Sequence, residues 1–382
     1  MKTYKNLYKK LCSTESLVSA YTKAKRGKAK KQAFIEFDKN AEQNLKQLQE
    51  ELINMTYNTR SLKRFIVRDP KTRTIHASAF RDRIVHHMLV NILEPIFERI
   101  FIYDSYASRR DKGTHLAIER FDAFKRKISR NGRLVRQKSG GSKNQVQGYV
   151  LKSDISRYFD NVDHKTLLNI IKRKVKDGKI IWLVQKVLNN FDIPVKGKGM
   201  PLGNYTSQFF ANVYLNDLDY FVKHELKAKY YIRYVDDMVI LHRSKKRLEY
   251  FKKKIINFLE GMKLELHPNK SEIISLQKGI TFLGYRIFYK HKILRKRNRK
   301  YFLKKFDKYL NLYNEEVISD EQLIAKLQGW FGYAQWANTY LLRKRLIEKT
   351  AELFKRKNPN KIQDLYKLLK ETYIIQKFLT FS

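Results

Sequence analysis

The stretch YIRYVDDMVI, residues 231–240, places two adjacent carboxylates, Asp236 and Asp237, between apolar runs that favour β-strands. An ordinary hairpin turn would explain a bare Asp-Asp pair, because Asp is a common turn residue. A third carboxylate, Asp154, ends another β-prone run, YVLKSD. The stretch between Asp154 and Asp236 is long enough for a helical crossover, so the two strands could be neighbours in one sheet.

Carboxylates that converge at neighbouring strand ends repel each other unless cations lie between them. Mg²⁺ takes oxygen ligands and keeps coordination positions open for substrate phosphates. Two such ions about 4 Å apart would clamp the attacking and leaving oxygens of an in-line phosphoryl displacement. We therefore expect Asp154, Asp236 and Asp237 to be catalytic ligands of two Mg²⁺ ions, for which Mn²⁺ could substitute, in a nucleotidyl transfer reaction.

The charge balance points to a polyanionic partner. The chain has 382 residues, with 81 Lys and Arg against 37 Asp and Glu, which gives a net charge of +44. Nucleic acid is favoured over a membrane surface, because phosphate contacts supply sequence-independent affinity. The sequence has no apolar run of about 18 residues and no signal-peptide core near its start. One cysteine, Cys12, excludes an internal disulfide, so we expect an intracellular protein without a membrane partner.

Hydrophobic periodicity predicts a mixture of helices and short strands. A hairpin is expected over 62–77, a flexible basic loop over 131–147, a strand near 148–155 and several short strands over 263–295. Helices are expected at 32–55, 81–99, 114–128, 163–174, 179–190, 204–226 and 245–261, and from 299 to the end.

Five motifs in order resemble reverse transcriptases: LKSDISRYFDNVDH, GMPLGNYTSQFFANVYLNDLD, YVDD, LELHPNKSEI and ITFLGYRI. The agreement extends from about residue 60 to 295. The resemblance implies an α+β right-hand fold, with an N-terminal extension and fingers at 1–148. A palm at 149–295, which includes some fingers elements, would have an antiparallel sheet with helices on one side. A helical thumb and tail would follow at 296–382. It also implies an RNA-directed DNA polymerase that uses an RNA template, a DNA or RNA primer and dNTPs.

By this resemblance, Asp154 and Asp236 are the ligands shared by both metals, and Asp237 completes the paired motif. Phe159 takes the place of an aromatic gate against the ribose 2′-hydroxyl, with a core Phe beside Tyr158 as the alternative. Gln208 would contact the incoming nucleotide and template, unless it only begins the long helix. Lys270 matches a lysine that neutralises the departing pyrophosphate.

The fingers and the primer side of the site follow from the same resemblance. Lys71 and Arg73 on the hairpin would grip the triphosphate, because guanidinium and ammonium groups bind phosphate oxygens. Arg81 is a further candidate, with helix-surface salt bridges to Asp82 or its neighbours as the alternative. The motif FLGY resembles a primer grip of Leu283, Gly284 and Tyr285, although by itself it indicates only a β-turn. His86, His87 and His115 complete no metal-ligand spacing, so we interpret them as structural.

The subgroup rests on fewer motifs. PLGNYTSQ replaces the PQG and LSP of many group II intron enzymes, and neither an endonuclease tail nor the Val-Thr-Gly element of retron enzymes is found. LGNYTSQFFANVYLNDLD, FRDRIVHHMLVNILEPIFERIFIYDSYASRRDKGTH and GWFGYAQWANTYLLRKRL instead resemble the reverse transcriptases of diversity-generating retroelements, within the prokaryotic group II intron-like lineage.

That subgroup implies a cytoplasmic enzyme of a prokaryotic cell. It would copy a template-repeat RNA with errors at adenines, in mutagenic retrohoming, with a small basic accessory protein in a ribonucleoprotein. A phage-defence or intron-derived prokaryotic reverse transcriptase is the alternative enzyme. A non-catalytic RNA-binding scaffold is the alternative of another class, and it would not need Asp154, Asp236 and Asp237.

Overall fold

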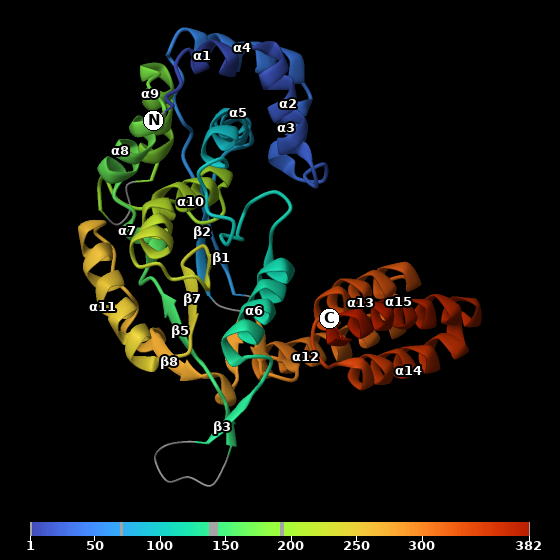
Figure 1. Cartoon of the computed structure of the whole chain (residues 1–382). Helices are drawn as coiled ribbons and strands as arrows, with labels where there is room; N and C mark the ends of the chain where they lie inside the picture. The colour runs from blue at the N-terminus through green and yellow to red at the C-terminus, as the bar shows by residue number, and fades with distance from the viewer. Residues whose placement is uncertain (1, 69–71, 137–143, 192–194, 382) are drawn as a thin grey trace. The chain divides into compact units, whose positions relative to one another are not determined.

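The chain divides into two compact units that are each built from separate segments. The computed structural model describes residues 2–68, 72–136, 144–191 and 195–381 (Figure 1). The first unit comprises 1–113, 151–240 and 249–272, and the second comprises 114–150, 241–248 and 273–382. The division follows packing and does not coincide with the expected boundaries at 148 and 295, which remain a prediction.

A four-stranded sheet carries the carboxylates that the sequence singled out. Its strand order is β6-β7-β5-β8. The strands before Asp154 and Asp236, β5 and β6, share this sheet as predicted, but they are not direct neighbours, because β7 lies between them. β6 and β7 form an antiparallel hairpin in which Tyr234 pairs with Asp237, so Val235 and Asp236 make the turn. Val235 has φ 55°, an unfavourable region for a β-branched residue. The strands are β5 (Tyr149–Asp154), β6 (Tyr231–Tyr234), β7 (Asp237–His242) and β8 (Glu272–Ser275).

Helices surround a buried central helix, α5, in the first unit. Apolar residues occupy most faces of α5, and both α2 and α10 pack against it. The predicted helix at 32–55 is two helices, because Asn40 leaves the helical region at φ −128° and ψ 47°. The predicted long helix at 204–226 is confirmed as α10 followed by a π-helical turn, Phe221–Glu225. The helices are α1 (Leu7–Leu11), α2 (Thr14–Lys25), α3 (Gln32–Asp38), α4 (Ala41–Ile53), α5 (Phe80–Phe97), α7 (Tyr158–Asn161), α8 (His164–Lys174), α9 (Gly178–Asn189), α10 (Tyr205–Tyr220) and α11 (Lys245–Gly261), whose first residues belong to the second unit.

The predicted hairpin at 62–77 is confirmed. β1 (Lys63–Val67) pairs antiparallel with β2 (Arg73–Ala77), with Val67 opposite Arg73. The tip of the hairpin, 69–71, lies outside the described residues, and Lys71 with it. A 3₁₀ turn, Pro268–Lys270, comes shortly before β8.

The second unit combines α6, a three-stranded sheet of order β11-β10-β9 and a bundle of C-terminal helices. Apolar side chains of all four C-terminal helices share one core, and Figure 1 shows these helices side by side. This confirms the helical pattern predicted after 299. The elements are α6 (Thr114–Ser129), β9 (Ile280–Phe282), β10 (Tyr285–Ile287), β11 (Lys292–Leu294), α12 (Lys296–Asn314), α13 (Asp320–Ala334), α14 (Tyr340–Lys357) and α15 (Ile362–Phe381), with 3₁₀ turns at Leu276–Lys278 and Pro359–Lys361.

The prediction of a loop throughout 131–147 is wrong at both ends. β3 (Leu134–Arg136) and β4 (Asn144–Val146) pair antiparallel, with Leu134 opposite Val146. Leu134, Val135 and Val146 provide enough β propensity for a short ladder despite the polar composition between them. In the described parts of the chain, no helix has both the length and the apolar character that a membrane span requires.

Candidate active site

Three segments that are distant in sequence meet at the predicted catalytic carboxylates. Asp154 ends β5, and the amide of the next residue, Ile155, donates a hydrogen bond to the carbonyl of Asp236 at 3.3 Å. On the other side, the amide of His267 donates to the carbonyl of Asp154 at 2.7 Å. The backbone thus holds Asp154 between the Val235-Asp236 turn and the segment that leads to Lys270.

Asp154, Asp236 and Asp237 bring three carboxylates close enough together to affect one another's ionisation. Burial, together with the neighbouring charges of Asp237 and Asp154, raises the pKa of Asp236 to about 6. The Lys270 ammonium donates a hydrogen bond to Oδ2 of Asp154 at 2.5 Å. Lys270 therefore belongs to the cluster and compensates the charge of one of the three carboxylates. Its predicted role at the departing pyrophosphate stays a prediction.

The donor chemistry of the cluster fits a divalent cation. Carboxylate oxygens are the ligands that Mg²⁺ prefers, and Asp154 and Asp237 are close enough to Asp236 for their charges to contribute to its raised pKa. Nevertheless, in the part of the chain that the structure describes, no three Asp, Glu, His or Cys side chains form a preassembled metal-binding group. One oxygen of Asp154 is engaged by Lys270. The metal assignment therefore rests on donor type and proximity.

A buried ion pair supports the turn between β6 and β7, and the sequence does not predict it. Arg233 is fully buried, and its guanidinium donates to both carboxylate oxygens of Asp219 at 2.7 and 2.6 Å. It also donates to Oδ1 of Asn212 at 3.0 Å and to the carbonyl of Val235 at 3.2 Å. Asp219 raises the pKa of Arg233, although burial alone would lower it. An arginine within an apolar strand and an aspartate within a buried helix were the signals that could have revealed this pair.

Phe159 lies on α7, five residues after Asp154, and is not a core residue. Its neighbour Tyr158 is the buried one, with a hydroxyl that donates to the carbonyl of Ala211 at 2.7 Å. Burial raises the pKa of Tyr158, and Asp236 is among the charges that affect it, so α7 lies close to the catalytic turn. Phe159 itself is half-buried and contacts the Tyr158 ring edge-on. The core residue of this pair is thus Tyr158 and not Phe159. The role of Phe159 as a gate against the ribose 2′-hydroxyl stays a prediction.

The segment before α10 joins Phe159 to the β1-β2 hairpin. The amide of Met200 donates to the carbonyl of Phe159 at 2.7 Å. Gly203 has φ +103°, and a Cβ there would lie 3.0 Å from the side chain of Ile75 on β2. Asn204 Oδ1 accepts a hydrogen bond from the amide of Ser78 at 3.3 Å, just after the same strand. This packing fixes the hairpin against the start of α10.

Arg73 and Gln208 are therefore carried by elements that pack together. Arg73 begins β2 with an exposed side chain. Gln208 lies in the first turn of α10, where its exposed amide oxygen accepts a hydrogen bond from the Ser108 hydroxyl at 3.3 Å. Both side chains are accessible to a ligand, and their roles in nucleotide binding stay predictions.

Arg81 is already engaged within the protein. Its guanidinium pairs with Glu51, donates to the carbonyl of Asn58 and lies over the Tyr57 ring at 5.1 Å. The side chain is only 12% exposed. This geometry agrees with the alternative interpretation of Arg81 as a salt-bridge residue, with Glu51 of α4 as its partner. Because its guanidinium is engaged in these contacts, Arg81 is not assigned to triphosphate binding.

The FLGY motif forms a tight turn between β9 and β10 that packs on α13. Leu283 and Gly284 have φ 45° and 92°. The Tyr333 hydroxyl donates to the carbonyl of Gly284 at 2.8 Å, and a Cβ at Gly284 would lie 2.6 Å from that hydroxyl. Tyr285 is buried, and its hydroxyl donates to the carbonyl of Tyr333 at 2.8 Å. The glycine is required by Tyr333, and contact of this turn with a primer stays a prediction.

His86, His87 and His115 are packed against other parts of the protein. Burial lowers the pKa of His86 to about 3 and that of His87 to about 4, so both rings are neutral at physiological pH. His87 packs on Tyr205, and His115 stacks on Trp336 at a centroid distance of 4.2 Å. These contacts agree with the structural interpretation of all three.

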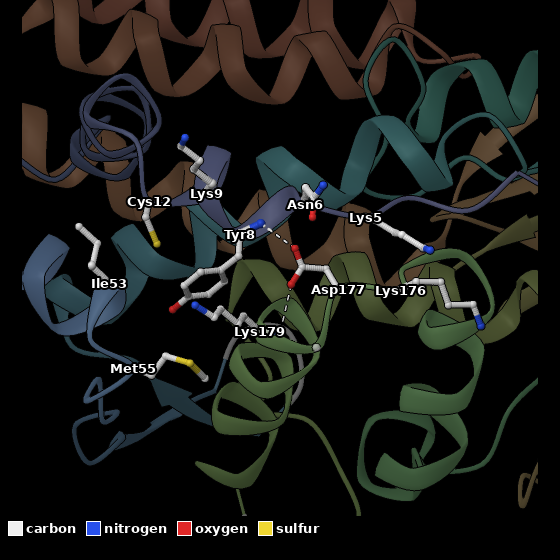
Figure 2. A pocket seen from close by; sticks show the side chains of 11 residues that line it. Lys5, Asn6, Tyr8, Lys9, Cys12, Ile53, Met55, Lys176, Asp177 and Lys179 are labelled. Atoms are coloured by element: carbon white, nitrogen blue, oxygen red, sulfur yellow. Dashed lines mark hydrogen bonds between the residues drawn. The ribbon is translucent and has the colours of Figure 1, made fainter.

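A cavity of about 1010 Å³ in the first unit is lined by none of the predicted site residues. Figure 2 shows Asp177 between the start of α1 and the start of α9. Its Oδ2 accepts from the amides of Leu7 and Tyr8 at 2.7 and 2.9 Å, and its Oδ1 accepts from those of Lys179 and Ile180 at 3.0 and 3.2 Å. One carboxylate thus caps two helices. This cavity is therefore separate from the carboxylate cluster.

The chain is similar to several known proteins. The family of reverse transcriptases (RNA-dependent DNA polymerases) matches residues 67–287, more than half of the chain. Protein YkfC of Escherichia coli K12 is 26% identical over 292 residues, which cover 66% of this chain and 71% of YkfC. The group II intron-encoded protein LtrA of Lactococcus lactis subsp. cremoris is 29% identical over 198 residues, which cover 50% of this chain and 30% of LtrA. Apo telomerase from Candida tropicalis has a TM-score of 0.48 at 15% identity, over 84% of this chain and 67% of that one.

The chain belongs to the reverse transcriptase family, the RNA-dependent DNA polymerases. The predicted enzyme class and the mixed α/β fold are thereby confirmed. The relatives include a group II intron-encoded protein, of which the chain spans less than a third.

Proposed function

We propose that the chain copies an RNA template into cDNA by nucleotidyl transfer at Asp154, Asp236 and Asp237. The observation that carries this proposal is the convergence of the three carboxylates with Lys270. Two Mg²⁺ ions, or Mn²⁺ in their place, would be held by the three carboxylates and would neutralise the triphosphate and activate the primer 3′-hydroxyl.

Other side chains of the protein bind the substrates and the departing pyrophosphate. The Lys270 ammonium, poised on Asp154, neutralises charge on the departing pyrophosphate. Arg73, with Lys71, binds the triphosphate through charge-assisted hydrogen bonds. Phe159 excludes a ribose 2′-hydroxyl, Gln208 contacts the nucleotide and template, and the turn of Leu283, Gly284 and Tyr285 contacts the primer.

Primer extension on a defined RNA template tests the catalytic assignment. Asp236→Ala should abolish extension with Mg²⁺ and all four dNTPs, while RNA binding and folding persist. Asp217→Ala is the matched control, because Asp217 is a surface carboxylate of the same unit that pairs with Arg173. Extension by the Asp236→Ala protein would refute the assignment, and RNA binding without extension by the unaltered chain would favour a scaffold.

We propose further that the enzyme belongs to a diversity-generating retroelement and makes errors opposite template adenines. The motifs PLGNYTSQ and GWFGYAQWANTYLLRKRL support this subgroup. Its partner would be a small basic accessory protein in a ribonucleoprotein, in the cytoplasm of a prokaryotic cell. Sequencing of the cDNA tests the proposal, and substitutions concentrated at template adenines are the expected result.

An intron-derived reverse transcriptase is the second candidate. The 29% identity to LtrA over half of the chain favours it. Faithful cDNA from the same extension assay, with errors spread evenly over the four template bases, would select this candidate over the retroelement enzyme.

A further inference from the structure

A second cavity, of about 230 Å³, lies entirely within the second unit. It is formed by α6, by the turn between β10 and β11 and by the residues that follow α13. The side chains that matter for its chemistry are those of Lys125, Tyr289, Lys290, Lys292, Gln335 and Trp336. None of them belongs to the carboxylate cluster.

Two aromatic rings of the cavity are held in fixed positions. His115 stacks on Trp336 with ring planes 15° apart, so one face of the indole is covered. Tyr289 is fixed by Gly132, whose φ of +82° and missing side chain allow the backbone to approach; a Cβ there would collide with the Tyr289 ring. Rings that are already ordered lose little entropy when a flat ligand stacks on them.

One residue that lines the cavity, Gln335, has a hydrogen-bond acceptor without a donor among the described residues. Gln335 is 9% exposed, and its Nε2 donates to the carbonyl of Gly332 at 3.0 Å. Its Oε1 is buried and has no partner among the described residues. A buried amide oxygen without a partner costs free energy, so a ligand N–H that reaches it would be favoured.

Cations complete the lining. The ammonium groups of Lys125 and Lys292 both contact Asp122, at 2.6 and 2.5 Å, and their side chains are 6% and 12% exposed. Lys125 also donates to the carbonyl of Phe288 at 3.1 Å. Lys290 is exposed at the same cavity. Three ammonium groups against one carboxylate leave a net positive charge.

We infer that this cavity binds one unpaired nucleotide of a single strand. The base stacks on the aromatic rings and donates an N–H to Oε1 of Gln335, while its phosphate contacts Lys290 and Lys292. Unpaired bases are available for such stacking, whereas bases inside a duplex are not. The site gives the second unit a contact with single-stranded nucleic acid that is independent of the polymerisation chemistry.

Tryptophan fluorescence can report on this cavity alone. The chain has three Trp residues, so the variant Trp182→Phe/Trp330→Phe leaves Trp336 as its only tryptophan. A titration with a twelve-nucleotide oligo(rA) at low salt should quench Trp336, because a stacked base quenches indole emission. AMP should quench only at much higher concentration, and ribose 5-phosphate, which has no base, should not quench. Equal affinity for AMP and oligo(rA) would identify a site for free nucleotides instead of a strand.

A second comparison does not depend on the reporter variant. In the otherwise unaltered chain, Gln335→Met keeps the side-chain volume and removes the acceptor, so affinity for the oligonucleotide should fall about fivefold. Gln328→Met, an exposed position on α13, is the matched control and should bind as the parent does. Equal anisotropy titrations for the two variants, or binding of the oligonucleotide without quenching of Trp336, would overturn the inference.

Discussion

At the scale of the residue, Asp236 is held where its ionised form is disfavoured. Its pKa in the folded protein is about 6, against 3.8 for an unperturbed Asp, because of burial and the charges of Asp237 and Asp154. Between these two pH values the folded state binds more protons than the unfolded state does. The contribution of Asp236 to stability is therefore fully present below about pH 4 and is lost as pH rises through 6. Above that pH, ionised Asp236 destabilises the fold without a bound cation.

We predict that Asp236→Asn stabilises the protein while abolishing its activity. In EDTA at pH 8 the free energy of unfolding should rise by about 1–3 kcal/mol, since the side chain is partly exposed and its repulsion is screened. At pH 4 the gain should disappear, because Asp236 is then protonated in the folded state. Urea unfolding at the two pH values measures this, and an Asn variant that gains nothing at pH 8 would contradict the pKa argument.

Arg233 is the residue through which the fold supports the catalytic turn. Arg233→Met leaves Asp219 buried and unpaired, which should lower the free energy of unfolding by about 3–5 kcal/mol. Arg173→Met is the control: the pair of Arg173 with Asp217 is solvent-exposed, so its loss should cost less than about 1 kcal/mol. Denaturant unfolding compares the two. Similar losses for both variants would mean that the buried pair is less important than its geometry indicates.

At the scale of the element, Asp177 joins two helices through one side chain. Asp177→Ala removes the N-cap of α9 and both hydrogen bonds to the first turn of α1. The free energy of unfolding should fall by about 2–3 kcal/mol, because two helix starts lose their acceptor. Ser13→Ala removes the cap of α2 alone, and about 1 kcal/mol is expected. Thermal unfolding with these two variants checks the difference, and an equal cost would show that α1 does not depend on Asp177.

Elements were predictable where local sequence determines them. The hairpins at 62–77 and 231–240 and the helix that begins at Asp163 follow from turn residues and periodicity, and Asp163 does cap α8. The break at Asn40 was missed because the apolar stripe continues across it. The partners of Arg233 and Gly284 could not be predicted, because Asp219 and Tyr333 reach them only through tertiary packing. Lys270 was placed correctly by its motif, and its contact with Asp154 required the structure.

At the scale of the whole molecule, the net charge of +44 dominates encounters with nucleic acid. We predict that RNA affinity falls by about 10³–10⁵ between 50 and 200 mM salt, as expected if six or more phosphates are contacted. Fluorescence anisotropy with a labelled RNA at several salt concentrations gives the slope. An RNA affinity that does not change with salt concentration would mean that the basic residues lie in solvent and do not contact RNA phosphates.

The ribosome makes Asp177 much later than the first turn of α1, to which its carboxylate is hydrogen-bonded. Leu7 and Asp177 are 170 positions apart, so at roughly 5–20 residues per second the ribosome makes them roughly 10–30 s apart. The five-residue α1 is too short to persist alone in water. During that interval Tyr8 and Leu11, which are buried in the finished protein, can already pack on α2 and α5, but the first turn of α1 lacks the acceptor that Asp177 supplies. The hydrogen bonds from α1 to Asp177 can therefore form only late in the synthesis of the chain.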